Sequence, residues 1–179
     1  MMLKNSEKKC RKSKQYIGTY KVPFFNNFRT YIMTTIQNEV LIDASIEKIW
    51  EALTNIGELG KYDPTIKKCT VLSETTKGIG ALRKVTMKDG KNWFEEKCTV
   101  LEQHEALTFE LTNCSFPVQN LNHSYSFEQK DNRIKVTQIM KYQVKYGFIG
   151  SILDRLVMRK QSDKGIKLFL GGLKSYTEN

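Results

Sequence analysis

The sequence predicts one α+β domain, in which a curved antiparallel sheet of about seven strands surrounds a long C-terminal helix. Apolar and polar residues alternate through most of residues 66–146, as they do in strands with one buried face. From Phe148 the apolar residues recur instead at helical spacing. Two short helical patterns follow the first strand, and this order of elements is typical of α+β proteins. A chain of 179 residues is long enough for one domain with a sizeable core.

The first predicted strand covers residues 36–42, and a helical pattern follows it directly. Residues 43–45 (Asp-Ala-Ser) have the chemistry of a helix N-cap, and apolar residues then recur at helical spacing. Gly57 and Gly60 interrupt that helix, a second short helical turn follows, and Pro64 ends it. These patterns predict two short helices after the first strand.

The first hairpin can be paired residue by residue from its turn. Residues 89–90 (Asp-Gly) are a strong signal for a two-residue turn in which both residues have φ > 0. A turn closed at this point places Arg83 opposite Glu96 and Val85 opposite Phe94. These four side chains share one face, because alternate residues of a strand point the same way. The other face is largely polar, so we expect these four to point inward.

A second, weaker turn at residues 131–132 (Asp-Asn) predicts another hairpin. Phe109 lies on the apolar side of the strand between the two hairpins. The inward face of the second hairpin then carries four facing pairs: Phe127 with Val136, Tyr125 with Gln138, His123 with Met140, and Leu121 with Tyr142.

The terminal helix must cover the apolar side of this sheet. Its broad apolar face consists of Ile149, Ile152, Leu153, Leu156, Ile166, Phe169, Leu170 and Leu173. Gly165, Gly171 and Gly172 within it cost about 1 kcal/mol each relative to alanine. A close approach of the helix to a neighbour or a ligand would explain them, and fraying near the C-terminus would also explain the last two.

A strongly curved sheet around a single helix cannot close along its whole length, and the gap predicts a mostly apolar ligand cavity. The predicted ligand-binding residues are those on the inward face: Arg83, Val85, Phe94, Glu96, Phe109, His123, Tyr125, Gln138 and Met140.

Three of these residues have more than one interpretation. The facing charges of Arg83 and Glu96 either anchor a polar or anionic ligand head or form a self-contained ion pair that fixes the hairpin. His123 has a side chain suited to general base catalysis. A hydrogen-bonded residue of the core or of the cavity wall is the favoured interpretation, because no Ser, Cys or Asp partner is placed beside it. We therefore assign no catalytic residue.

The charge is concentrated at the N-terminus. Residues 1–32 hold 8 basic and 1 acidic residue, a net of +7, whereas the rest of the chain holds 21 basic and 18 acidic residues, a net of +3. We expect a basic, disordered arm over residues 1–32 and a ligand-binding domain over residues 33–179, and Met33 would make a natural initiator. The arm is either a functionless extension, which we favour, or a segment that binds RNA or anionic lipid or directs the chain to an organelle.

Several classes of function are disfavoured by what the sequence lacks. The near-neutral body predicts no nucleic-acid binding by the folded domain. No apolar stretch approaches the roughly 18–20 residues of a membrane helix and no secretory signal is evident, so we expect a cytoplasmic protein. Cys10, Cys69, Cys98 and Cys114 lack metal-site spacing, and no metal or cofactor is predicted.

Several segments resemble a known superfamily. They are residues 44–50, 59–66, 78–83 with Asp89-Gly90 and Glu96, 116–118 and 172–173. The chain resembles the START-related superfamily of helix-grip proteins, and most of all its polyketide cyclase/dehydrase-like branch in the SRPBCC family. The resemblance implies a ligand cavity, with activities in the superfamily that range from aromatase or cyclase through lipid carriage to no known chemistry. Tyr62 and Gln138 stand where members often have Trp, which would alter the shape of the pocket.

The predicted function is the binding, transport or sequestration of a small hydrophobic molecule such as a lipid or polyketide. One alternative is a polyketide cyclase or dehydratase, with His123 or Glu96 as acid and base and with Tyr125 or Arg83 polarising a carbonyl. A second alternative is a protein-interaction module that uses the basic arm.

Overall fold

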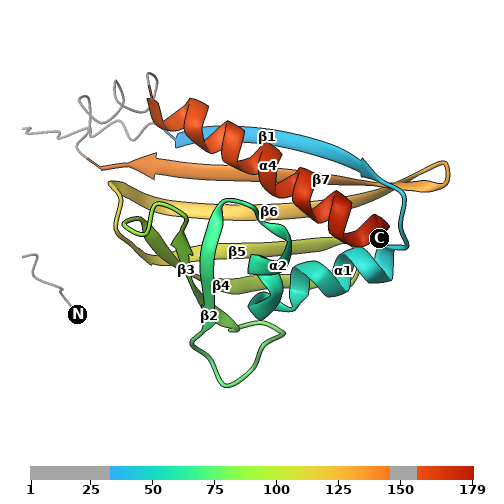
Figure 1. Ribbon diagram of the computed structural model, residues 1–179, viewed down its shortest axis with the longest axis horizontal. Helices are drawn as coiled ribbons and strands as arrows, with labels where there is room; N and C mark the ends of the chain where they lie inside the picture. The colour runs from blue at the N-terminus through green and yellow to red at the C-terminus, as the bar shows by residue number, and fades with distance from the viewer. Residues whose placement is uncertain (1–32, 146–156) are drawn as a thin grey trace, which may run out of the picture.

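The computed structural model describes residues 33–145 and 157–179, which form one curved antiparallel sheet with helices on its inner side (Figure 1). The strands are β1 (Met33–Ile42), β2 (Ile66–Val71), β3 (Leu82–Met87), β4 (Trp93–Glu102), β5 (Ala106–Cys114), β6 (Val118–Lys130) and β7 (Arg133–Val144). The helices are α1 (Ile46–Thr54), the 3-10 turn η1 (Ile56–Glu58), α2 (Leu59–Tyr62) and α4 (Arg159–Glu178).

The seven strands lie in the order β1-β7-β6-β5-β4-β3-β2. Helix α4 crosses the sheet diagonally, and its C-terminal end lies beside α1 and α2 (Figure 1). The helix also runs against the edge strand β1, where Asn38 donates to Asp163 and Lys174 donates to the carbonyl of Leu41. The predicted helix-grip architecture is confirmed.

The predicted cap of α1 is confirmed as well. The backbone of Ser45 is extended, and its hydroxyl accepts a hydrogen bond from the N–H of Lys48 at 3.3 Å. Ile49 and Leu53 are buried against the core, as the helical spacing predicts. The chain then passes through η1 into α2, so the two predicted short helices are joined by a 3-10 turn.

Both hairpins have the predicted pairing in their central parts. In β3 and β4, Arg83 pairs with Glu96 and Val85 with Phe94. In β6 and β7, Phe127 pairs with Val136, Tyr125 with Gln138, and His123 with Met140. The alternation of inward and outward side chains follows from this pairing.

The turn of the first hairpin differs from the prediction. Gly90 has a φ of 70°, but Asp89 does not have a positive φ. The Asp89 carboxylate instead accepts the N–H groups of Lys91 and Asn92, both at 2.8 Å. These local side-chain bonds hold a longer loop, closed by the Met87 N–H on the carbonyl of Asn92, and the pairing of the strands is unchanged.

A second difference lies in β6. The register shifts between Gln119 and Asn122, and Asn120 has a φ of 52°. The predicted pair of Leu121 and Tyr142 falls at this irregularity and is therefore not part of the regular ladder. Both residues are buried nonetheless.

Part of the predicted terminal helix lies outside the described residues, as does the predicted arm 1–32. The predicted helical pattern over residues 148–156 belongs to that part, and α4 is described from Arg159 onward. Its apolar residues Ile166, Phe169, Leu170 and Leu173 are buried.

Gly172 marks the closest approach of α4 to the rest of the domain. A Cβ atom at this position would lie 1.8 Å from the carbonyl oxygen of Tyr62 and 3.1 Å from Cδ of Pro64. Close packing, rather than fraying, therefore requires this glycine. The neighbouring Gly171 has open space around it.

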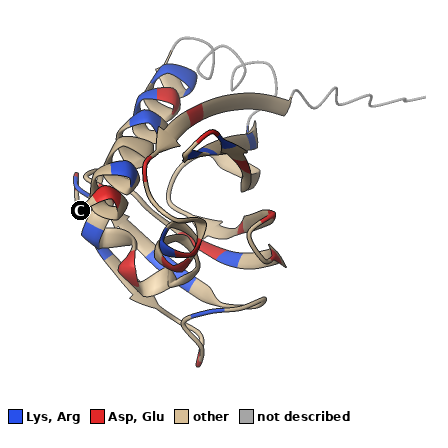
Figure 2. Cartoon of the chain, turned by 90° about the vertical axis from the view of Figure 1, so that its right-hand side faces the viewer, with Lys and Arg blue, Asp and Glu red and all other residues tan. Residues whose placement is uncertain are grey.

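Basic and acidic side chains are interspersed over the described chain (Figure 2). Among residues 33–145 and 157–179, the helices are too short or too polar to span a bilayer.

We predict that Gly172→Ala lowers the free energy of unfolding by about 3 kcal/mol, because a backbone carbonyl occupies the space of the new methyl group. Gly171→Ala is the matched control and should raise it by up to about 1 kcal/mol, through helix propensity alone. Urea denaturation measures both changes. Equal stabilities for the two variants would contradict the close contact.

Candidate functional site

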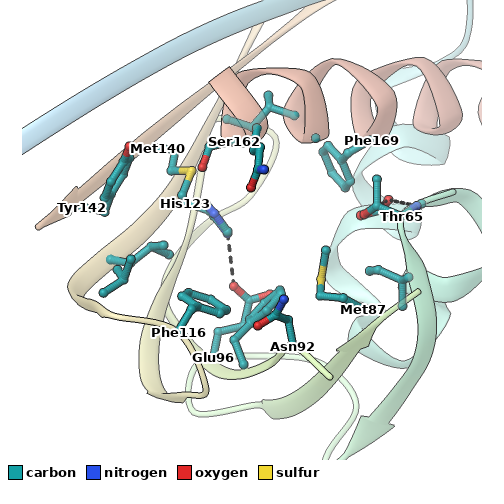
Figure 3. A pocket seen from close by; sticks show the side chains of 18 of the residues that line it. Thr65, Met87, Asn92, Glu96, Phe116, His123, Met140, Tyr142, Ser162 and Phe169 are labelled. Atoms are coloured by element: carbon teal, nitrogen blue, oxygen red, sulfur yellow. Dashed lines mark hydrogen bonds and ion pairs between the residues drawn. The ribbon is translucent and has the colours of Figure 1, made fainter. Parts of the chain in front are cut away.

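A cavity of about 500 Å³ lies between the inner face of the sheet and α4 (Figure 3). This volume is within the usual range of small-molecule sites, about 300–1,000 Å³. Apolar atoms make up most of the surface of its wall, and its apolar residues are Leu59, Ile66, Met87, Phe94, Phe116, Pro117, Val118, Leu121, Met140, Met158, Ile166 and Phe169. A space of this size is unusual in a protein interior, which is otherwise close-packed.

Seven of the nine predicted site residues line this cavity: Arg83, Phe94, Glu96, His123, Tyr125, Gln138 and Met140. Val85 and Phe109 share their inward face but do not reach the cavity. Val85 is 0% exposed, and Phe109 is 1% exposed and lies beneath the guanidinium of Arg83, whose Cζ is 4.5 Å from the ring centroid. These two residues belong to the packed core under the cavity floor.

Arg83 and Glu96 form a closed ion pair inside the domain. Arg83 Nε donates to Glu96 Oε1 at 2.8 Å, and Nη2 lies 2.7 Å from the same oxygen. Arg83 Nη1 is directed to the carbonyl of Ile56 at 3.4 Å. The residues are 3% and 1% exposed, so the guanidinium has its partners within the protein. This geometry favours the ion pair over the ligand anchor as the role of Arg83.

The ion pair keeps both side chains charged. Burial alone would raise the pKa of Glu96, but the Arg83 guanidinium and the hydrogen bond from His123 hold that pKa at about 2. Burial likewise disfavours the charged form of Arg83, and the Glu96 carboxylate outweighs it, so the pKa of Arg83 is raised.

His123 completes a chain of three polar side chains that reaches the cavity. Its Nδ1 lies 3.2 Å from Glu96 Oε2 (Figure 3). An ionised carboxylate can only accept, so Nδ1 carries the proton of this hydrogen bond. In the neutral ring the lone pair is then on Nε2, and this nitrogen is an acceptor or a base at the cavity wall.

Tyr125 and Gln138 form a second polar pair. Gln138 Nε2 donates to the Tyr125 hydroxyl at 3.2 Å, which leaves the hydroxyl proton free to donate. Burial raises the pKa of Tyr125 well above its ordinary value, so the hydroxyl stays protonated. Within the described chain, Gln138 Oε1 is buried without a hydrogen-bond partner.

Several cavity residues were not predicted. Asp63 and Thr65 follow α2, where the Asp63 carboxylate accepts the N–H of Thr65 at 2.8 Å and its hydroxyl at 2.7 Å. Gln161, Ser162 and Gly165 lie on α4 at the same helical spacing as the cavity residues Ile166 and Phe169. That spacing could have identified these α4 residues from the sequence, whereas no periodic pattern points to Asp63.

Among residues 33–145 and 157–179, no three His, Cys, Asp or Glu side chains are grouped to hold a metal ion. Cys69, Cys98 and Cys114 are free thiols. The arrangement can enclose an apolar molecule and offer it a few polar contacts.

The sequence of residues 33–178 matches the family of polyketide cyclase / dehydrase and lipid transport proteins. No curated protein matches the chain in sequence.

Three solved structures illustrate the likeness in fold. The Zhui aromatase/cyclase of a Streptomyces species has a TM-score of 0.70 and 13% identity, over 82% of this chain and 94% of the other. The major latex-like protein 151 of Panax ginseng has a TM-score of 0.66 and 11% identity, over 82% and 99%. The norcoclaurine synthase of Thalictrum flavum has a TM-score of 0.64 and 16% identity, over 82% and 95%. At such low identities the likeness concerns the fold alone.

Arg83→Met should lower the free energy of unfolding by about 3–5 kcal/mol, because it leaves the Glu96 carboxylate buried without a cation. The double variant Arg83→Met/Glu96→Gln removes that charge and should recover at least about half of the loss. Urea denaturation of the three proteins gives the comparison. A double variant no more stable than Arg83→Met would contradict a closed ion pair.

The ion pair also predicts a dependence on pH. Because the pKa of folded Glu96 is lowered, its contribution to stability is complete above the unfolded value of about 4.3 and is lost as the pH falls toward 2. Glu96→Gln resembles the protonated side chain, so its unfolding free energy should approach that of the wild type between pH 5 and pH 2. A gap that stays constant over this range would show that Glu96 is not held ionised.

Proposed function

The chain belongs to the family of polyketide cyclase / dehydrase and lipid transport proteins, and from this premise we propose that it binds a small hydrophobic molecule in its cavity. A lipid or a polyketide-like compound matches the apolar wall, and transport or sequestration would follow from enclosure. The cytoplasm remains the expected location.

One observation carries this proposal: the domain holds a space of about 500 Å³ where a single helix meets a curved sheet. Apolar atoms make up most of the surface of the wall, and burial of apolar ligand surface contributes roughly 25 cal/mol per Å². The few polar groups can orient a ligand without providing most of its affinity.

Native mass spectrometry of the purified protein tests the proposal, first alone and then with a library of lipids and aromatic compounds. The proposal predicts at least one bound species of fixed mass. Failure to retain any member of the library would refute it.

Gly165 offers a sharper test, because it lines the cavity and a Cβ atom there would meet nothing within 4 Å. Gly165→Phe should fill part of the cavity and weaken ligand binding by about tenfold or more. It should not lower the unfolding free energy, since phenylalanine has the higher helix propensity. Titration calorimetry with any compound found above measures the affinity.

Gly171→Phe is the matched control on the same helix, since Gly171 is exposed and lies outside the cavity wall. It should leave the affinity unchanged. Equal affinities for the wild type and Gly165→Phe would place the ligand elsewhere.

The hydrogen bond between Glu96 and His123 favours a second candidate function, a cyclase or dehydratase. His123 Nε2 would remove a proton from the carbon between two carbonyls of a polyketide. The Tyr125 hydroxyl would donate to the resulting enolate oxygen, and the proton held by His123 would return to the leaving hydroxyl in a dehydration.

His123→Ala should then lower the rate of product formation from a poly-β-ketone analogue by about 100-fold or more, with the affinity for the analogue retained. Product formation is followed by absorbance and mass spectrometry. Wild-type protein that binds the analogue without converting it would support binding alone and exclude this activity.

A further inference from the structure

Asp63 is a buried acidic residue of the cavity wall, and the ion pairs of the described chain do not include it. The residue directly follows α2 and is 9% exposed. Burial raises the pKa of Asp63, against the lowering effect of its hydrogen bonds from Thr65. In Figure 3, Thr65 lies on the side of the hollow opposite His123.

Only one oxygen of Asp63 is occupied by the protein. Oδ1 accepts both hydrogen bonds from Thr65, and no donor of residues 33–145 or 157–179 reaches Oδ2. In the described chain, the fully buried side-chain atoms that lack a hydrogen-bond partner are Thr99 Oγ1 and Gln138 Oε1. Asp63 Oδ2 is not among them, so protein atoms do not enclose this oxygen completely. Asp63 is one of the residues that line the cavity, and Oδ2 is the oxygen of its carboxylate that no donor of the described chain occupies.

The other charges of the cavity leave it negative. Its described wall contains one cationic residue, Arg83, and three carboxylates, those of Asp63, Asp89 and Glu96. Arg83 and Glu96 neutralise one another, and His123 directs its Nδ1–H to Glu96. Asp89 is exposed and accepts hydrogen bonds within its own loop. Asp63 is therefore the buried carboxylate of the described wall that forms no ion pair, although the charge of Arg83 acts to lower its pKa.

An apolar ligand that fills the cavity displaces water from Asp63 Oδ2. A carboxylate that loses water without gaining a donor is strongly destabilised, so such a ligand binds weakly for its size. A ligand that places an ammonium group at Oδ2 restores both the hydrogen bond and the charge balance. A hydroxyl restores only the hydrogen bond, and a ligand carboxylate adds repulsion.

We infer that the cavity selects hydrophobic amines, with the ammonium group on Asp63 and the apolar body against the aromatic and aliphatic wall. This inference rests on the proposed ligand-binding function and adds the chemical class of the ligand. If Arg83 were the anchor, the ligand would carry a negative head group. With Asp63 as the anchor, the head group is positive.

Three compounds of matched size and different head group test the inference: the amine 2-(1-naphthyl)ethylamine, the alcohol 2-(1-naphthyl)ethanol and the carboxylic acid 1-naphthaleneacetic acid. Calorimetric titration of the full chain at neutral pH should give an affinity for the amine about tenfold or more above that for the alcohol, with the acid weakest. Equal affinities, or an acid that binds best, would overturn the inference and leave the proposed function standing. Binding of none of the three would count against both.

Asp63→Asn removes the charge and keeps the oxygen that Thr65 requires, so the turn after α2 should be preserved. The amine should lose about tenfold in affinity or more, and the alcohol should bind as before. Asp131→Asn is the matched control, because it makes the same change in net charge at an exposed position outside the cavity wall and should retain the preference for the amine. A preference that survives in Asp63→Asn would overturn the assignment to this carboxylate, and unfolding in urea verifies that each variant is native.

Discussion

The contact between Gly172 and the Tyr62 carbonyl determines how α4 lies on the sheet. At this point the helix and the end of α2 approach so closely that even a methyl group is excluded. About two turns toward the N-terminus, Gly165 has free space around it, and α4 there forms the roof of the cavity. A straight helix held tightly at one end cannot also follow a curved sheet at the other. The cavity is therefore a consequence of where the helix is held, and not of missing apolar residues.

The polar groups of the cavity differ in what they can offer to a ligand. Arg83 and Glu96 are satisfied by each other, and their cost of burial is offset within the protein. Both residues line the cavity, and Glu96 also orients His123 beside it. Asp63, in contrast, has an oxygen that the described chain leaves open. Arg83 and Glu96, the facing charges that the sequence predicts most directly, are thus less available to a ligand than Asp63.

The pairing of the strands could be predicted from the sequence far better than how deeply each inward side chain is buried. The facing of Arg83 and Glu96 follows from the Asp-Gly turn and the alternation along a strand, and both hold although the turn itself has another geometry. Alternation assigns a face but says nothing of what covers it, so Val85 and Phe109 were predicted in the cavity and lie in the core beneath it. Asp63 follows a four-residue helix and obeys no period, and only the arrangement in space brings it to the cavity.

The order of the strands has a mechanical consequence. β1 and β2 stand at opposite ends of the sheet, so its circumference is not closed by hydrogen bonds between them. An open shell of this kind can change curvature by small rotations at each ladder without breaking any of them, whereas a closed barrel has its radius set by strand number and stagger. The walls of the cavity are therefore compliant across the strands and stiff along them. Ligands of different width can be accommodated at little elastic cost, while the length of a ligand is limited by the fixed strands and by α4.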